Sequence, residues 1–189
     1  WKQLLNGPVV IFFVVCFLMQ VSHGPYYSFY SIFMESKGYS KLAIGWLWAI
    51  GVIAEIVVFM VMHRLMGRFS ARFLLALSLG LGAIRWYLTA AFPEQLWIVL
   101  LTQICHAATF GIFHAVAIDW VQHRFTSNAS GQAQAFYSAL SFGAGGAIGS
   151  YAAGMMWEDV GGEASFYMAS AACFIGAILA LKLRPPQLS

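Results

Sequence analysis

Six runs of mostly apolar residues, each long enough to cross a lipid bilayer, dominate this sequence. They cover residues 8–34, 42–62, 73–91, 96–118, 132–156 and 164–181. A spanning helix needs about 20 such residues. Only 9% of the residues are charged, whereas a soluble domain carries roughly 25%. The sequence therefore predicts an all-α membrane protein with six transmembrane helices. It excludes an ordinary cytosolic enzyme, and its small net charge of +3 does not suggest nucleic-acid binding.

Basic residues outside these runs gather in the connections on one side of the predicted membrane. That side holds Lys2, Arg64, Arg68, Arg72, Arg124, Lys182 and Arg184. The opposite side holds only Lys37 and Lys41. Basic residues favour the cytoplasmic side of a membrane protein. We therefore expect the chain to enter and leave the membrane on the cytoplasmic side, where the connection from Arg64 to Arg72 also lies.

Three ionisable residues lie deep inside apolar runs: Glu55, Arg85 and His106. At 1.5 Å per residue, Arg85 and His106 lie about 18 Å above the cytoplasmic end and Glu55 about 10 Å. A charge at mid-membrane costs about 2.5–3.5 kcal/mol, so such residues pair with each other or line a polar cavity. We expect a functional network in which Arg85 is the partner of Glu55. The alternative is an inert ion pair that holds the second and third helices together.

The first run contains the sequence Ser22-His23-Gly24-Pro25 near mid-membrane. Proline removes a backbone hydrogen bond, and helix breaks at this depth mark substrate paths in transporters. We therefore expect a broken helix here, with His23, Tyr26 and Tyr27 facing a ligand. For Tyr30 an interfacial aromatic belt is an equal alternative.

In the fourth run His106, Phe110 and His114 are spaced by four residues, so they share one helix face. No third ligand accompanies the two histidines, so this pattern predicts a face of a substrate cavity and no metal site. In the fifth run Gly145 and Gly149 form a small-xxx-small pattern, which allows a second helix backbone to approach closely.

Several phrases carry a resemblance to a known family. They are the segments 51–56 (GVIAEI), 83–86 (AIRW), 103–106 (QICH) and 137–143 (YSALSFG), together with the basic connection from Arg64 to Arg72. On these residues the chain resembles the C-terminal half of a major facilitator superfamily permease, in the phenylpropionate-permease-type branch related to the lactose permease. The resemblance implies helices seven to twelve of a twelve-helix transporter, built as a 3+3 inverted repeat. It also implies an N-terminal six-helix half as partner and a bacterial inner membrane as location.

The resemblance assigns roles as well. The lactose permease family has a Glu, an Arg and a His on helices eight, nine and ten, and Glu55, Arg85 and His106 are similar to these. The family also has a proton-carrying Glu three residues after the His, where this chain has Thr109. Glu55 is then the best carboxylate for proton coupling. The proton is the expected coupling ion, and no cofactor is expected.

The substrate that this branch suggests is a phenylpropionate-like aromatic acid, held by Arg85 near Tyr26, Tyr27, His23, Phe110 and His114. A sugar or nucleoside symporter of the same fold is an alternative substrate assignment. Outside the transporters, the alternatives are a six-helix channel or structural membrane subunit and an intramembrane enzyme.

Overall fold

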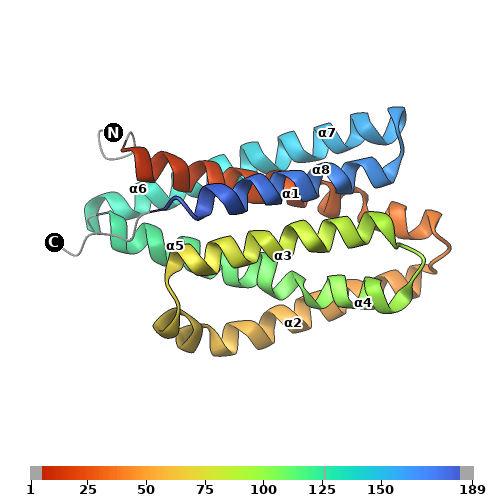
Figure 1. Ribbon diagram of the computed structural model, residues 1–189, viewed down its shortest axis with the longest axis horizontal. Helices are drawn as coiled ribbons and strands as arrows, with labels where there is room; N and C mark the ends of the chain where they lie inside the picture. The colour runs from red at the N-terminus through yellow and green to blue at the C-terminus, as the bar shows by residue number, and fades with distance from the viewer. Residues whose placement is uncertain (1–5, 126, 184–189) are drawn as a thin grey trace.

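The computed structural model describes residues 6–125 and 127–183, and this part of the chain contains helices but no strand. The helices are α1 (Gly7–Ser36), α2 (Lys41–Arg68), α3 (Ala71–Ala91), α4 (Leu96–Ile104), α5 (Phe113–Arg124), α6 (Ser127–Ser138), α7 (Gly146–Asp159) and α8 (Gly162–Ala180). Two π-helical segments, η1 (Ala107–Ile112) and η2 (Ala139–Gly145), join α4 to α5 and α6 to α7. The chain thus crosses the molecule six times, as predicted (Figure 1).

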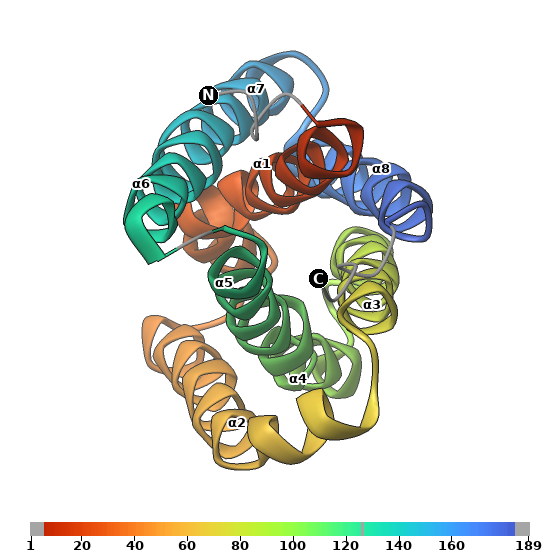
Figure 2. The same cartoon turned by 90° about the vertical axis from the view of Figure 1, so that its left-hand side faces the viewer.

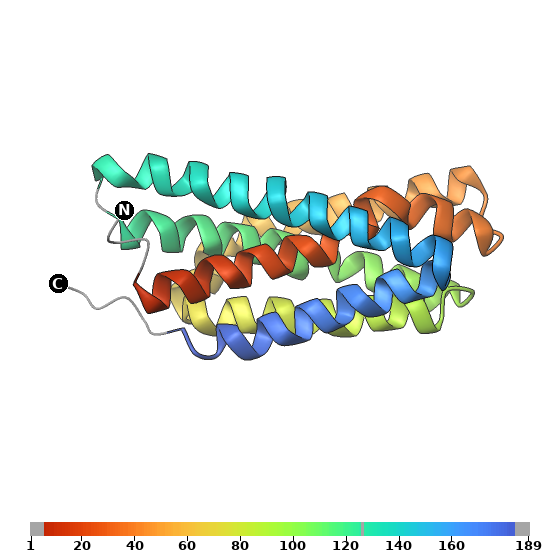
Figure 3. The same cartoon turned by 90° about the horizontal axis from the view of Figure 1, so that it is seen from above.

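All six crossings run along the long axis of the molecule (Figure 3). α1 begins and α8 ends at the same end of the bundle as the α2–α3 turn. Five helices are long and apolar enough to cross a membrane, and the fourth of these runs from Leu96 to Arg124. The remaining crossing, 127–159, is rich in Ser and Gly. The chain is therefore a multi-pass membrane protein. Lys2 and Arg184, two of the basic residues used for orientation, lie outside the described residues.

The connection predicted between residues 63 and 72 is mostly helical, which corrects the sequence prediction. α2 continues to Arg68 and α3 begins at Ala71, so only Phe69 and Ser70 lie between them. The Ser70 side chain accepts a hydrogen bond from the Phe73 backbone N–H and caps α3. The prediction stopped each helix where apolar residues stop, whereas a helix can continue beyond the hydrocarbon layer.

α1 is one continuous helix through Pro25, so the predicted helix break is wrong. Proline leaves the carbonyl four residues earlier, that of Val21, without its helical partner. Gly149 of α7 packs directly against this carbonyl. The contact is so close that a Cβ built on Gly149 would lie less than 3 Å from the Val21 backbone. The Ser150 hydroxyl also donates to the Gly24 carbonyl at 3.3 Å. The neighbouring helix therefore covers the site of the missing bond.

Glycines on both helices make this crossing possible. A Cβ on Gly24 would overlap the Gly149 backbone, and a Cβ on Gly145 would lie 2.9 Å from the Phe17 carbonyl oxygen. The Gly145-x-x-x-Gly149 pattern therefore does bring two backbones together, as predicted.

The six crossings do not pack evenly. α1 lies between α7 and α8, and α8 also packs along α3 (Figure 2). α2 packs mainly against α4 and η1. Only 17% of the apolar stretch of α2 is buried within the molecule, compared with 61% of that of α1. The crossing from Leu96 to Arg124 therefore separates α2 from α3, and this arrangement decides which polar groups meet.

Candidate functional site

Arg85 lies at the centre of a buried polar cluster and is only 1% exposed. Its Nη1 donates to Nδ1 of His106 at 3.1 Å and to the Thr109 hydroxyl at 3.0 Å. The guanidinium carbon lies 4.5 Å from the ring centre of Tyr26 and 4.0 Å from that of Trp86. Cation–π contacts of this kind stabilise a positive charge away from water. Three different transmembrane helices thus hold one buried cation.

Glu55 approaches this cluster through His106. Its carboxylate Oε2 lies 3.8 Å from Nε2 of His106. Within the described residues no ion pair of 4 Å or less joins Glu55 to Arg85. The expected direct pair is replaced by a relay in which His106 lies between Glu55 and Arg85. The reason is the position of η1 between α2 and α3 (Figure 2). Gly111 of η1 makes room for Glu55, since a Cβ there would lie 3.1 Å from the glutamate Cγ.

The relay has a defined direction of hydrogen bonding. An arginine side chain only donates, so Nδ1 of His106 must accept from Arg85. The hydrogen of neutral His106 therefore sits on Nε2, the nitrogen that faces Glu55. A proton added at Nδ1 would remove the acceptor that Arg85 uses.

Aromatic rings surround the polar cluster. The rings of His106 and Phe110 stack with centres 5.5 Å apart, and those of Phe110 and His114 stack at 5.8 Å. The predicted shared face of these three residues is therefore confirmed. The Tyr26 ring lies 5.3 Å from His106 and is buried, whereas Tyr27 beside it is 50% exposed.

The two other predicted histidines differ in their distance from Arg85. His23 on α1 is fully buried, and its ring centre lies 6.0 Å from that of His106. His114 is half-buried at the far end of the stacked rings, where its Nδ1 lies 3.0 Å from the Tyr137 hydroxyl. His23 thus belongs to the cluster, and His114 lies at its edge.

Sequence reasoning missed residues that complete the site. The Tyr26 hydroxyl donates to Oε1 of Gln103 at 2.8 Å, and Nε2 of Gln103 donates to the Tyr30 hydroxyl at 2.8 Å. Gln103 lies one turn before His106, so an amide inside an apolar run was the signal available. Tyr30 is buried beside Tyr26, a position that does not fit an interfacial belt.

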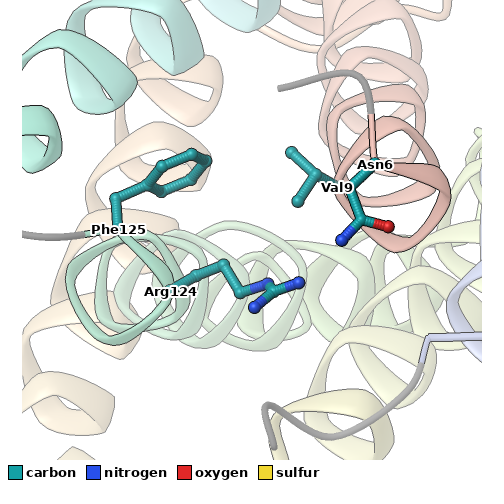
Figure 4. A pocket seen from close by; sticks show the side chains of 4 residues that line it. All are labelled: Asn6, Val9, Arg124 and Phe125. Atoms are coloured by element: carbon teal, nitrogen blue, oxygen red, sulfur yellow. The ribbon is translucent and has the colours of Figure 1, made fainter. Parts of the chain in front are cut away.

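A small cavity lies far from this cluster, at the end of the bundle where α1 begins and α5 ends. It measures about 160 Å³ and is lined by Asn6, Val9, Arg124 and Phe125 (Figure 4). Val9 precedes Tyr26 by 17 residues on α1, which is about 25 Å along the helix. None of the predicted site residues lines this cavity. Among the described residues no group of three His, Cys, Asp or Glu side chains is arranged to hold a metal ion.

Comparison with known proteins gives this geometry a family context. The sequence is 34% identical over 185 residues to a protein of Escherichia coli K12 named "Probable 3-phenylpropionic acid transporter", covering 98% of this chain and 47% of that protein. It is 26% identical over 161 residues to the "Uncharacterized transporter YwbF" of Bacillus subtilis 168, covering 85% of this chain and 40% of that protein.

The chain thus spans about half the length of the curated relatives it matches. The family described as "MFS_1 like family" matches residues 1–169. This match covers most of the six crossings and every residue of the Arg85 cluster. The chain therefore belongs to the MFS_1 like family of membrane transporters and is not an enzyme.

Proposed function

We propose that this chain is the C-terminal half of a proton-coupled symporter that carries a small aromatic carboxylic acid. The observation that carries the proposal is the state of Arg85. Its guanidinium is buried. It donates hydrogen bonds to His106 and Thr109 and makes cation–π contacts with the rings of Tyr26 and Trp86. Nε and Nη2 of Arg85 have no hydrogen-bond partner among the described residues.

A buried cation without a carboxylate partner is costly unless an anion binds to it. Nε and one Nη of an arginine form the fork that binds a carboxylate through two hydrogen bonds. The rings of Tyr26, Tyr27 and Phe110 lie close by and would pack against an aromatic group. A carboxylate joined to a ring therefore suits this site, and the name of the E. coli relative suggests a phenylpropionate-like acid. A sugar or nucleoside would leave the charge of Arg85 uncompensated.

Proton coupling is assigned to Glu55 acting through His106. When Glu55 is ionised, its carboxylate faces the Nε2–H of His106, and Nδ1 of the same ring engages Arg85. When Glu55 is protonated, that attraction weakens, and Arg85 is freer to bind the substrate carboxylate. The proton is then the only coupling ion, and no other cofactor is needed.

The rest of the proposal concerns the complete transporter. An N-terminal six-helix half would pack against this chain, lipid would surround both, and the two halves would rock to expose the site alternately. The location would be a bacterial inner membrane, with α1 entering from the cytoplasm. A cysteine at Ser70, which is exposed in the α2–α3 turn, should resist membrane-impermeant thiol reagents in intact cells. Ready labelling would reverse the orientation.

The deciding experiment uses the complete transporter in proteoliposomes with an imposed proton gradient. The wild type should accumulate 3-phenylpropionate against its gradient. Glu55→Gln, which keeps the shape but carries no ionisable proton, should abolish accumulation while exchange of internal for external substrate continues. If Glu55→Gln accumulates substrate like the wild type, the coupling proton is carried elsewhere.

A further inference from the structure

A second unpaired polar group lies beside Arg85, and it is an acceptor. His23 is 0% exposed, and its Nδ1 lies 2.9 Å from the Met19 carbonyl oxygen. The Ser22 hydroxyl uses its only hydrogen for the same oxygen, at 2.6 Å, and lies 3.3 Å from Nδ1. If Nδ1 carried no hydrogen, it would face only lone pairs. The ring hydrogen of neutral His23 is therefore on Nδ1.

This assignment leaves Nε2 of His23 as a hydrogen-bond acceptor. It has no partner among the described residues, although it is fully buried. The neighbouring rings are Trp86 at 5.2 Å, Tyr27 at 5.9 Å and Phe110 at 6.0 Å between ring centres, and none of them donates to it. A buried acceptor without a donor loses its hydration and gains nothing in return.

His106 cannot supply the missing hydrogen. Its ring is 6.0 Å from that of His23, but Arg85 occupies its Nδ1 and its Nε2 faces Glu55. Nε2 is therefore in opposite states in the two histidines. In His106 it carries a hydrogen that faces Glu55, and in His23 it has a free lone pair within the aromatic cluster.

We propose that Nε2 of His23 accepts a hydrogen bond from a hydroxyl group on the transported acid, so that the site selects hydroxylated aromatic acids over unsubstituted ones. This inference rests on the proposed function, because Arg85 supplies the site for the carboxylate. A carboxylate only accepts hydrogen bonds. It can therefore satisfy Nε and Nη2 of Arg85 but not Nε2 of His23, and the donor must come from another part of the same ligand.

Tyr27 provides the route to this atom. It contacts His23 and is 50% exposed, so it is the most open of the rings that cover the histidine. The side of His23 that Tyr27 covers is therefore the side from which a ligand would approach.

The test compares ligands that differ by one hydroxyl. Binding of 3-phenylpropionate and of its monohydroxylated forms, with the hydroxyl at each ring position or on the chain, is measured on the complete transporter. At least one hydroxylated acid should bind about three- to tenfold more tightly than 3-phenylpropionate, as expected for one neutral hydrogen bond. His23→Asn keeps a donor toward Met19 but has no atom at the Nε2 position, so it should bind the hydroxylated acid no more tightly than 3-phenylpropionate.

Two further variants make the comparison specific. His23→Gln places an amide oxygen near the Nε2 position and should recover part of the preference. His123→Asn is the matched control, since Nδ1 of His123 also lies 2.9 Å from the carbonyl four residues earlier, but its side chain is exposed at the end of α5. This control should leave both affinities unchanged.

Three results would overturn the inference. The first is a wild type without any preference for a hydroxylated acid, and the second is an equal loss of both ligands in a folded His23→Asn protein. The third needs no variant: nitrogen NMR of the wild type that finds the ring hydrogen of His23 on Nε2. If no aromatic acid binds to the wild type at all, the proposed function fails instead, and the NMR result still reports on His23.

Discussion

Two faces of the same stretch of α1 have opposite hydrogen-bonding states. On one face, the Val21 and Gly24 carbonyls near Pro25 are covered by Gly149 and Ser150 of the fifth crossing. On the other face, His23 enters a cluster in which Nε2 of His23 and two donors of Arg85 have no partner among the described residues. Both faces are buried, so exposure to water does not explain the difference.

The comparison separates packing from binding. Helices in a membrane associate through close packing of small residues, and the first face fulfils that requirement completely. A polar group buried without a partner weakens the fold, and proteins keep such groups mainly at functional sites. We therefore assign stability to the glycine face and ligand binding to the Arg85 face, and the following changes test that division.

The largest effect is expected at the glycine face. Gly149→Ala places a methyl group against the Val21 backbone, which cannot move away as a side chain could. We expect a loss of about 3 kcal/mol or more in the free energy of unfolding, measured by denaturant titration in detergent micelles. Gly80→Ala is the control, because its Cβ would meet nothing within 4 Å. Equal stability of the two variants would show that the crossing is not tightly packed.

Arg85→Met should reduce substrate affinity strongly but leave the stability of the fold intact. It removes two free donors and a buried charge, so affinity for 3-phenylpropionate should fall about 100-fold or more, as measured by calorimetry on the complete transporter. The free energy of unfolding should stay unchanged or rise by about 1 kcal/mol, because an apolar side chain replaces a cation with no carboxylate partner. A strong loss of stability would mean that Arg85 is a structural residue.

Gln103→Leu should affect both properties moderately. It leaves the Tyr26 and Tyr30 hydroxyls without their shared partner, which should cost about 1–3 kcal/mol of stability. Because the Tyr26 ring lies against Arg85, substrate affinity should fall about tenfold as well. Gln122→Leu, an exposed position on α5, is the matched control and should change neither. Wild-type affinity in Gln103→Leu would show that Tyr26 does not depend on this amide.

The smallest effect is expected at the loop end of the bundle. Lys37 forms an ion pair with Glu163 that joins α1 to α8, and both side chains are partly exposed. Lys37→Met should lower the free energy of unfolding by less than about 1 kcal/mol, which is measured as a small decrease in melting temperature. Lys41→Met should have no measurable effect, because Lys41 is 86% exposed and lies 3.8 Å from Glu35. A cost for Lys37→Met as large as that for Gly149→Ala would show that close backbone packing is not the main source of stability.

The sequence by itself determined the number of crossings and the matching level of Arg85 and His106 on neighbouring helices. Both follow from local properties, since apolar length sets a spanning helix and the rise per residue sets the level of Arg85 and His106. The stacked column of His106, Phe110 and His114 was also predictable, because it depends only on positions along one helix.

Only the tertiary structure decided which groups meet. Whether Glu55 reaches Arg85 depends on which helix lies between α2 and α3, and this packing places His106 there. The continuity of α1 at Pro25 was likewise decided by a glycine more than 120 residues away that covers the free carbonyl. Pairing between helices depends on their order in space, which hydropathy and spacing along one helix do not encode.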